Sequence, residues 1–223
     1  MALGYTQHTL QTDQDLTDAI KALKKEPILA IDTEFIRRDT YYPHFALLQI
    51  ATEFESYLID PLKQVCLAPL KDLFQNPLIL KIFHASRQDI EIFKNLFQKV
   101  PKFVADTQVL AQFCGFEDNL SLQFLCEQFF KVTLSKEFQK LNWLKRPLPE
   151  KALTYAREDV EYVYHLHQAL HEKAGEKYIW FQEDMLEFES EGFYEETPEK
   201  LLAKFISERV HSVSAKQFLG SSN

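Results

Sequence analysis

Apolar residues follow two spacings along this chain, one typical of strands and the other typical of helices. Runs rich in branched and aromatic residues, bounded by Pro, Asn or charged residues, predict strands at 27–35, 45–52, 55–61, 78–85 and 102–107. Apolar residues three or four positions apart predict helices at 12–25, 67–76, 86–98, 108–115, 121–130 and 149–173. A pair of early strands followed by alternating strands and helices indicates an α/β fold with a mixed sheet.

The longest predicted helix, 149–173, begins with a proline and has one apolar stripe. The members of the stripe are Leu153, Ala156, Val160 and Val163. Tyr155 and Asp159 flank this stripe, whereas Glu158 and Glu161 are expected to point outward. The histidines of this helix show no ligand-like clustering and are expected on its surface: His165, His167 and His171.

The composition is that of a globular protein with a sizeable core, since 46% of the 223 residues are apolar and 26% are charged. A net charge of −8 argues against indiscriminate binding to phosphates. Charge is uneven, however: 131–151 has six Lys or Arg and two Glu, whereas 176–200 has nine acids and two Lys. The basic stretch can meet a polyanion, although an ordinary solvated surface explains it equally well.

Several features indicate a cytoplasmic protein that needs no membrane. The N-terminus has no basic segment followed by an apolar one, and no stretch long enough to span a bilayer is free of charge. Cys66, Cys114 and Cys126 lie in apolar surroundings without a C-x-x-C spacing, which indicates reduced thiols packed in the core. The sequence becomes acidic after about residue 175, so we expect one domain over 1–175 and a helical extension over 176–223.

Two acids, Asp32 and Glu34, stand near the end of the strand predicted at 27–35. Residues two apart in a strand share a face, so both carboxylates point the same way. Burying such a pair without partners is costly. Either the acids bind something or this strand end is exposed to solvent, and the pair alone does not distinguish the two.

Further polar residues stand where other elements begin or end. His84 ends a predicted strand, Ser86 is placed to cap the next helix, and Asp89 lies in the first turn of that helix. Sites in open α/β sheets gather at such junctions, although an acid in a first turn also favours the helix dipole. Tyr155 and Asp159 are four apart and therefore neighbours on one helix face, where a tyrosine packed beside an ordinary acid is the alternative.

These acids together suggest a metal site. Carboxylate oxygens suit Mg²⁺ or Mn²⁺, and four carboxylates brought together without cations would repel: those of Asp32, Glu34, Asp89 and Asp159. Two divalent ions about 3.5–4 Å apart would resolve that repulsion and clamp the attacking and leaving oxygens of a phosphodiester. The Tyr155 hydroxyl could hold the attacking water. The sequence lacks the G-x-x-x-x-G-K-[ST], G-x-G-x-x-G, H-E-x-x-H and G-x-S-x-G motifs of other common chemistries.

Three segments, in this order, resemble the exonuclease motifs of the DEDD superfamily: "DTEF" at 32–35, "HASRQD" at 84–89 and "YAREDVEYVY" at 155–164. The tyrosine four residues before Asp159 marks the tyrosine subclass, since the histidine subclass would have His where this chain has Thr154. Longer segments such as "ADTQVLAQFCG" and "NWLKRPLPEKALTYAREDV" resemble bacterial ribonuclease D, and the resemblance covers residues 25–170.

This resemblance implies a ribonuclease-H-like fold with a mixed five-stranded sheet flanked by helices, and hydrolysis of RNA from its 3′ end to nucleoside 5′-monophosphates. The four acids would bind two divalent ions, Mg²⁺ or Mn²⁺, and Tyr155 would position the water. Candidates for substrate binding are Thr33, Phe35, Gln49 and His84, each of which core packing explains as well. Among these, Phe35 could stack on the terminal base. The implied partners are RNAs with a free 3′ end, such as tRNA precursors, and we expect a monomer.

The chain departs from the family pattern in two places. Where the family has Ser-Asp-Trp, this chain has Leu141-Asn142-Trp143, so an acid is missing beside the basic stretch. Residues 197–219 resemble only the opening of a helicase-and-RNase-D C-terminal domain, and weaker RNA binding with lower selectivity is expected without the rest. Two other functions stay open: a 3′→5′ DNA exonuclease with the same metal site, and an inactive nucleic-acid-binding module, which the complete set of acids disfavours.

Overall fold

The computed structural model describes residues 4–37, 42–63 and 65–190. Its strands are β1 (Thr6–Leu10), β2 (Ile28–Ile36), β3 (His44–Ala51), β4 (Glu55–Ile59), β5 (Leu80–Phe83) and β6 (Val104–Asp106). Its helices are α1 (Asp13–Leu23), α2 (Ala68–Gln75), α3 (Arg87–Phe97), α4 (Thr107–Phe113), α5 (Leu122–Phe130), α6 (Glu150–Ala174) and α7 (Lys177–Met185), with short 3₁₀ turns η1 (Pro61–Lys63) and η2 (Leu186–Glu189). The helices and strands predicted from apolar spacing are all present.

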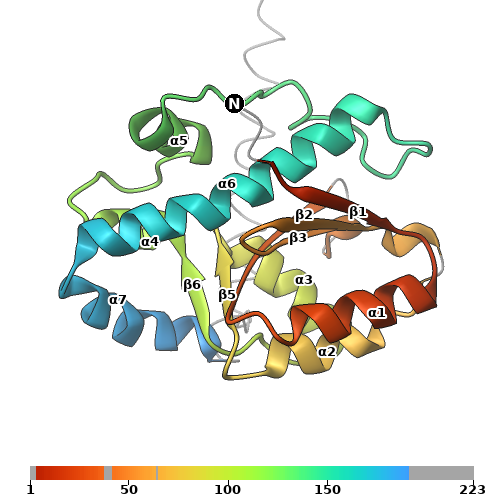
Figure 1. Cartoon of the computed structure of the whole chain (residues 1–223), viewed down its shortest axis with the longest axis horizontal. Helices are drawn as coiled ribbons and strands as arrows, with labels where there is room; N and C mark the ends of the chain where they lie inside the picture. Colours follow the sequence, from red (N-terminus) through yellow and green to blue (C-terminus); the bar gives the residue numbers. More distant parts are fainter. Residues whose placement is uncertain (1–3, 38–41, 64, 191–223) are drawn as a thin grey trace, which may run out of the picture. The chain divides into compact units, whose positions relative to one another are not determined.

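The strands form one mixed sheet with the order β1-β4-β3-β2-β5-β6. Strand β3 runs antiparallel to β2 and β4, whereas β1–β4, β2–β5 and β5–β6 are parallel pairs. Helix α6 crosses one side of the sheet, and α1, α2 and α3 lie on the other (Figure 1). This arrangement confirms the expected α/β fold with a mixed sheet.

In the described part of the chain the sheet has six strands instead of the five expected. The additional strand, β1, pairs in parallel with β4 at one edge, where Thr6 lies opposite Glu55. Only Leu10 of its sequence, TQHTL, is buried, so this segment lacks the apolar alternation that indicates a strand. Backbone pairing with β4, which is distant in the sequence, creates this strand.

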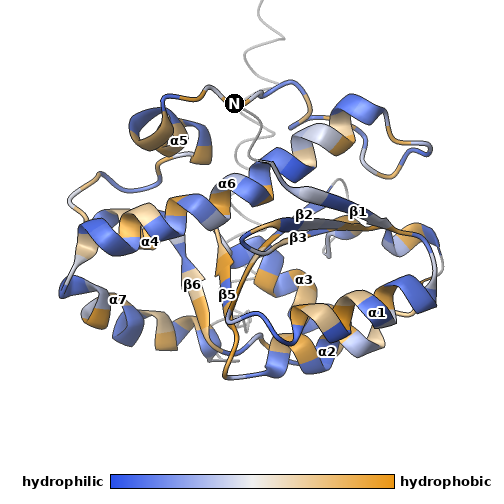
Figure 2. Cartoon of the chain, in the orientation of Figure 1, coloured by the Kyte–Doolittle hydropathy of each residue, from blue (hydrophilic) through white to orange (hydrophobic). Residues whose placement is uncertain are grey.

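Apolar side chains fill the space on both sides of the sheet. Strands β5 and β6 are buried throughout and are coloured as largely hydrophobic in Figure 2. On the α3 side, the Phe93 ring lies 4.5 Å from the Phe74 ring and 6.3 Å from the Phe83 ring. On the α6 side, one cluster joins α6 to β3, β4 and the preceding loop: Ala46, Leu47, Leu58, Trp143, Ala152, Tyr155 and Ala156.

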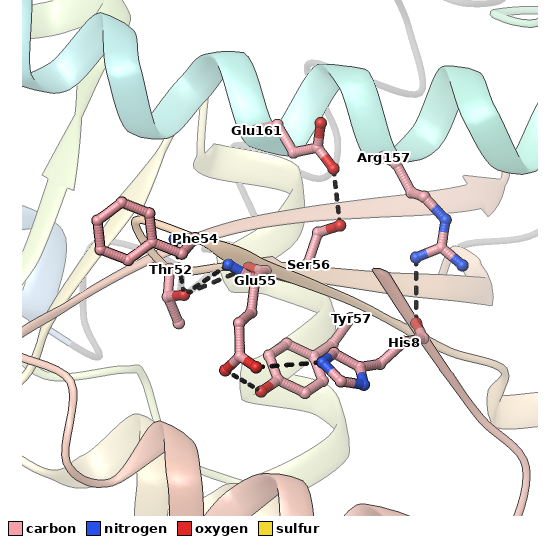
Figure 3. A network of polar contacts seen from close by, with 8 residues as sticks. All are labelled: His8, Thr52, Phe54, Glu55, Ser56, Tyr57, Arg157 and Glu161. Atoms are coloured by element: carbon pink, nitrogen blue, oxygen red, sulfur yellow. Dashed lines mark hydrogen bonds and ion pairs between the residues drawn. The ribbon is translucent and has the colours of Figure 1, made fainter. Parts of the chain in front are cut away.

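Polar contacts fix α6 along β1 and β4 (Figure 3). Ser56 Oγ donates to Glu161 Oε1 at 2.7 Å, and Arg157 Nη1 donates to the His8 carbonyl at 3.1 Å. The His8 ring stacks on the Tyr57 ring, with 4.6 Å between the centroids. The two hydrogen bonds from α6 set its position on the sheet. They thereby also set the positions of the polar side chains that α6 directs toward β2.

Two predictions for α6 are wrong. Glu161, expected to point outward, is 5% exposed because it lies against β4 and accepts the Ser56 hydrogen bond. His167, expected on the surface, is 2% exposed, and its Nε2 lies 2.9 Å from the Tyr178 hydroxyl. Helix α6 contacts α4, α5 and α7 as well as the sheet, so a single apolar stripe does not describe what it buries.

The cysteine prediction holds in part. Cys126 is buried and Cys114 is half-buried, but Cys66 is exposed, so core packing is wrong for Cys66. None of the helices in the described ranges is long and apolar enough to cross a membrane. Contacts group the chain up to Ser190 into one unit, in which α7 packs against α4 and β6. The division into 1–175 and 176–223 stays a prediction, and the expected C-terminal domain opening at 197–219 lies outside the described residues.

Candidate active site

The first two acids, Asp32 and Glu34, lie in the second half of β2. They share the face of the sheet that α6 covers, and Glu34 is close enough to Asp159 of α6 for the two charges to interact. The register between β2 and β3 shifts directly after Glu34, and Ala46 is the extra residue on β3. Such a bulge bends the strand pair and changes the direction of the side chains beside it.

Asp89 reaches the site from the first turn of α3. The Thr33 hydroxyl donates a hydrogen bond to Asp89 Oδ1, so the structure places Thr33 against an acid of the site. Ser86 does not cap α3 through its hydroxyl as predicted; its backbone N–H instead donates to Asp106 Oδ2 at 2.7 Å. Asp106 also accepts the Ala85 N–H at 3.0 Å. The end of β6 thereby fixes the start of the helix that carries Asp89.

Tyr155 and Asp159 both come from α6, one turn apart, and each is 7% exposed. The Tyr155 hydroxyl interacts with the Asp159 carboxylate, and this interaction lowers the cost of burying Asp159 as an anion. Asp159 Oδ1, however, has no hydrogen-bond partner in the described structure. Buried polar atoms rarely lack a partner, so this oxygen is suited to binding a ligand.

The pKa values of the acids show that these side chains lie within electrostatic reach of one another. Burial raises the pKa of Glu34, and repulsion by the other three acids raises it further. Burial, followed by repulsion from Asp32, likewise raises the pKa values of Asp89 and Asp159. Burial also raises the pKa of Tyr155, and Asp159 adds to the rise. Strand β2 and helices α3 and α6 thus bring four acids and one tyrosine together.

The donor set fits hard divalent cations. In the described ranges, no three His, Cys, Asp or Glu side chains lie close enough together to hold a metal ion. Metal binding would therefore draw the carboxylates closer. Carboxylate oxygens are the preferred ligands of Mg²⁺ and Mn²⁺. Cations would also relieve the repulsion that raises the pKa values, and Asp159 Oδ1 is an unused ligand atom. Metal binding by these acids stays a prediction.

The other predicted substrate contacts lie at different depths. Phe35 is half-buried in β2 and keeps part of its ring exposed. Gln49 lies opposite Asp32 on β3 and is 0% exposed, and neither of its amide atoms has a hydrogen-bond partner among the described residues. The two ring nitrogens of His84 are both hydrogen-bonded within the fold, Nδ1 to a threonine hydroxyl at 2.9 Å and Nε2 to a backbone carbonyl at 3.1 Å. Substrate contact by Phe35, Gln49 or His84 stays a prediction.

Two residues of the loop before α6 support the site without having been sequence candidates for it. Trp143 is 1% exposed and packs against Tyr155, with 6.3 Å between the ring centroids. Arg146 forms an ion pair with Asp60 at 2.7 Å. Their sequence signal is the segment "NWLKRP", which contributes to the family resemblance but has no helical or strand periodicity.

Comparison with known proteins places this fold and this group of residues in one family. A family model described as a 3′-5′ exonuclease matches residues 7–174, a range that contains all four acids and Tyr155. The chain belongs to the 3′-5′ exonuclease family. Membership accounts for the order of the three motifs along the chain.

Proteins named ribonuclease D are similar to this exonuclease-family chain. Ribonuclease D of Escherichia coli is 39% identical over 154 residues, which are 69% of this chain and 41% of the relative. Ribonuclease D of Gluconacetobacter diazotrophicus is 35% identical over 195 residues, 86% of this chain and 50% of the relative. The chain spans about half the length of these relatives or less.

A solved structure supports the same assignment. The crystal structure of E. coli ribonuclease D, described as an exoribonuclease involved in structured RNA processing, matches with a TM-score of 0.79 and 33% identity. The match covers 86% of this chain and 51% of that chain. The resemblance to bacterial ribonuclease D and the implied α/β fold are thereby confirmed, with six strands in the described sheet instead of five.

Proposed function

We propose that this chain is a divalent-metal-dependent 3′→5′ exoribonuclease that releases nucleoside 5′-monophosphates from the 3′ end of RNA. The observation that carries the proposal is the meeting of four acids and a tyrosine, from β2, α3 and α6, in a chain of the 3′-5′ exonuclease family. Similarity to proteins named ribonuclease D supports RNA as the substrate class.

In this proposal each side chain has a definite task. The acids that would hold two Mg²⁺ or Mn²⁺ ions are Asp32, Glu34, Asp89 and Asp159. When bound, the ions supply charge stabilisation to the attacking and leaving oxygens of the phosphodiester. Thr33 holds Asp89 through its hydroxyl hydrogen bond. The Tyr155 hydroxyl orients the attacking water, and the Phe35 ring offers a stacking surface to the last base, whatever its identity.

The proposed cellular substrates are tRNA precursors and other small structured RNAs. The E. coli relative is described as acting in structured RNA processing, which supports this choice. The basic stretch 131–151 would follow the phosphate backbone upstream of the 3′ end. We also propose that the protein acts as a monomer in the cytoplasm.

One assay tests the proposal directly. Single-stranded RNA and DNA of the same sequence, labelled at the 5′ end, are incubated with the protein and Mg²⁺, Mn²⁺ or EDTA. RNA should be shortened stepwise from its 3′ end only with a metal ion, and Asp32→Asn should abolish the shortening. Glu158→Gln, which changes an exposed acid beside Asp159, is the matched control and should remain active.

Two results would change the assignment. If Asp32→Asn shortens RNA as fast as the wild type, the site is wrong. If DNA is degraded as readily as RNA, the protein is a 3′→5′ exonuclease without a preference for the 2′-hydroxyl, since DNA lacks that group.

A further inference from the structure

The guanidinium group of Arg146, in the loop between α5 and α6, is fully occupied within the protein. Its Nε and Nη2 donate to the two carboxylate oxygens of Asp60, at 2.7 and 2.8 Å. Nη2 also donates to the Ala46 carbonyl at 2.7 Å. Nη1 donates to the Trp143 carbonyl at 2.5 Å and to the Lys145 carbonyl at 3.0 Å. Because every nitrogen has an acceptor, this group is not available to an RNA phosphate.

These bonds join three parts of the molecule that surround the site. Asp60 directly follows β4, and Ala46 is the extra residue of the β3 bulge next to Glu34. An extra residue at a bulge stands outside the regular strand ladder, and here Arg146 binds its carbonyl. The paired contacts between a guanidinium and a carboxylate fix orientation as well as distance. Arg146 therefore fastens its loop to the end of β4 and to β3, the strand that pairs with β2.

The fastened loop forms the wall against which Tyr155 packs. Trp143 lies with its ring centroid 6.3 Å from that of Tyr155, and Phe138 lies at 5.9 Å. Trp143 and Tyr155 also share a buried cluster with Ala46. The position of the Tyr155 ring, and hence of its hydroxyl, depends on these neighbours.

We propose that Arg146 is a positioning residue for the reaction. By tying the loop to Asp60 and Ala46, it holds Trp143 against Tyr155 and so places the hydroxyl that orients the attacking water. This inference rests on the proposed role of Tyr155. It separates Arg146 from its basic neighbours, because loss of Arg146 should slow turnover, whereas loss of an exposed lysine should weaken RNA binding.

The first test compares Arg146→Gln with Lys145→Gln, which removes the same charge from an exposed side chain one residue away. For Arg146→Gln, kcat should fall about tenfold or more while KM changes less than about twofold, because orientation in the transition state is lost. Lys145→Gln should raise KM and leave kcat unchanged. Arg146→Lys should recover little activity, because lysine lacks the planar fork. A raised KM with unchanged kcat in Arg146→Gln would overturn the proposal, since that is the result expected of an RNA contact.

A double-mutant cycle tests whether Arg146 acts through Tyr155. In a Tyr155→Phe background, Arg146→Gln should lower kcat by less than about twofold, because the hydroxyl that Arg146 positions is already gone. The full fall in that background would show that the two residues act independently and would overturn the inference. A Tyr155→Phe enzyme as fast as the wild type would reject the role of Tyr155 itself and remove the basis of the inference.

Fluorescence gives a readout that does not depend on activity. The chain has two tryptophans, and Trp180 is 59% exposed, so Trp180→Phe leaves the buried Trp143 as the single emitter. Releasing the loop by Arg146→Gln should shift the Trp143 emission to longer wavelength in a protein that still unfolds cooperatively. If that variant does not fold, Asp60→Asn weakens the same contacts and should give the shift. Unchanged emission in a folded variant would overturn the proposal.

Discussion

Asp32 raises the pKa of each of the other three acids of the site, after burial, which is the larger cause. Buried like charges oppose folding, so the protein gains no stability from bringing these side chains together. The arrangement would become favourable only if cations bound between the carboxylates, as proposed. Individual residues in this region therefore have different effects on stability and on activity.

The Tyr155 hydroxyl should matter for turnover and little for metal binding. For Tyr155→Phe we expect kcat to fall by about 100-fold, because the hydrogen bond that orients the reacting water is lost. The ring, and its packing on Trp143, remain. Steady-state kinetics and calorimetric titration with Mn²⁺ measure the two effects separately.

A matched control is Tyr162→Phe, which changes another buried tyrosine of α6 whose ring packs on Phe130. It should retain wild-type turnover. If Tyr155→Phe instead loses Mn²⁺ affinity with kcat intact, the tyrosine supports the acids and does not orient water.

Gln49 allows the effect of one buried polar side chain on stability to be tested. Both of its amide atoms are buried opposite Asp32, and neither has a hydrogen-bond partner in the part of the chain that the structure describes. Replacing a buried unpaired polar group by an apolar one of similar size removes a desolvation cost, so Gln49→Leu should raise the free energy of unfolding by about 1 kcal/mol. Urea unfolding of the metal-free protein measures the change. A loss of stability would contradict this prediction and would indicate that the amide is hydrogen-bonded in solution.

At the scale of elements, the site depends on how α6 lies across β2. Strand β2 supplies acids at alternate positions up to the bulge, and α6 supplies Tyr155 and Asp159 one turn apart. Contacts on the same stretch of α6 hold it in place, since Arg157 binds the His8 carbonyl and Glu161 accepts a hydrogen bond from β4. The polar network of Figure 3 is thus a structural support for the site.

The contact between α6 and α7 should make stability depend on pH. His167 of α6 lies 2.9 Å from the Tyr178 hydroxyl of α7, and burial lowers the pKa of His167 to about 4. Unfolded histidine has a pKa of about 6.5, so between those values the unfolded chain binds more protons than the folded one. This contribution is therefore fully favourable above pH 6.5 and is lost as the pH falls toward 4.

A single variant, His167→Gln, tests the contribution of His167 to the pH dependence of stability. Between about pH 7.5 and pH 5, the wild type should lose on the order of 2 kcal/mol more stability than His167→Gln, which has no titrating group at this position. Urea unfolding at the two pH values gives the difference, and the contributions of titrating groups that do not interact with His167 cancel in the comparison. Equal losses in both proteins would contradict a buried neutral histidine.

At the scale of the whole molecule, the site exists only because the sheet brings distant segments together. Thr33 and Asp89 are 56 residues apart in the sequence, and Arg146 and Asp60 are 86 apart. The buried core on both sides of the sheet offsets the repulsion among the acids. Metal binding should therefore be visible as a change in the stability of the whole fold.

Divalent cations are expected to stabilise the folded protein. At a free Mn²⁺ concentration of 100 times Kd, linkage gives a gain of about 2.7 kcal/mol in the free energy of unfolding. Asp32→Asn should lose this gain. Without metal it should melt at a higher temperature than the wild type, because it removes the charge that repels the other three acids.

Thermal unfolding in EDTA and in Mn²⁺ measures both effects. Glu158→Gln, which removes an exposed acid of α6, should follow the wild type in both conditions. A wild type whose melting temperature does not respond to Mn²⁺ would contradict a metal site in this fold.

By itself, the sequence determined the local elements and the chemistry of the candidate site. Apolar spacing located six of the seven described α-helices and five of the six described strands, because burial of one face imposes a period of 3.6 or 2 on residues that are neighbours in the chain. Side-chain chemistry singled out the four acids and Tyr155, because few residue types serve as hard oxygen ligands or hold a reacting water.

Only the tertiary structure decided the features that depend on segments far apart in the sequence. Strand β1 exists through pairing with β4, the Asp106 carboxylate holds the backbone just before α3 where the Ser86 hydroxyl was expected to act, and Glu161 is buried against β4. The ion pair between Arg146 and Asp60 likewise joins segments far apart in the sequence. None of these has a local pattern, because a hydrogen bond across the fold depends on the distance between two atoms in space and leaves no period in the chain.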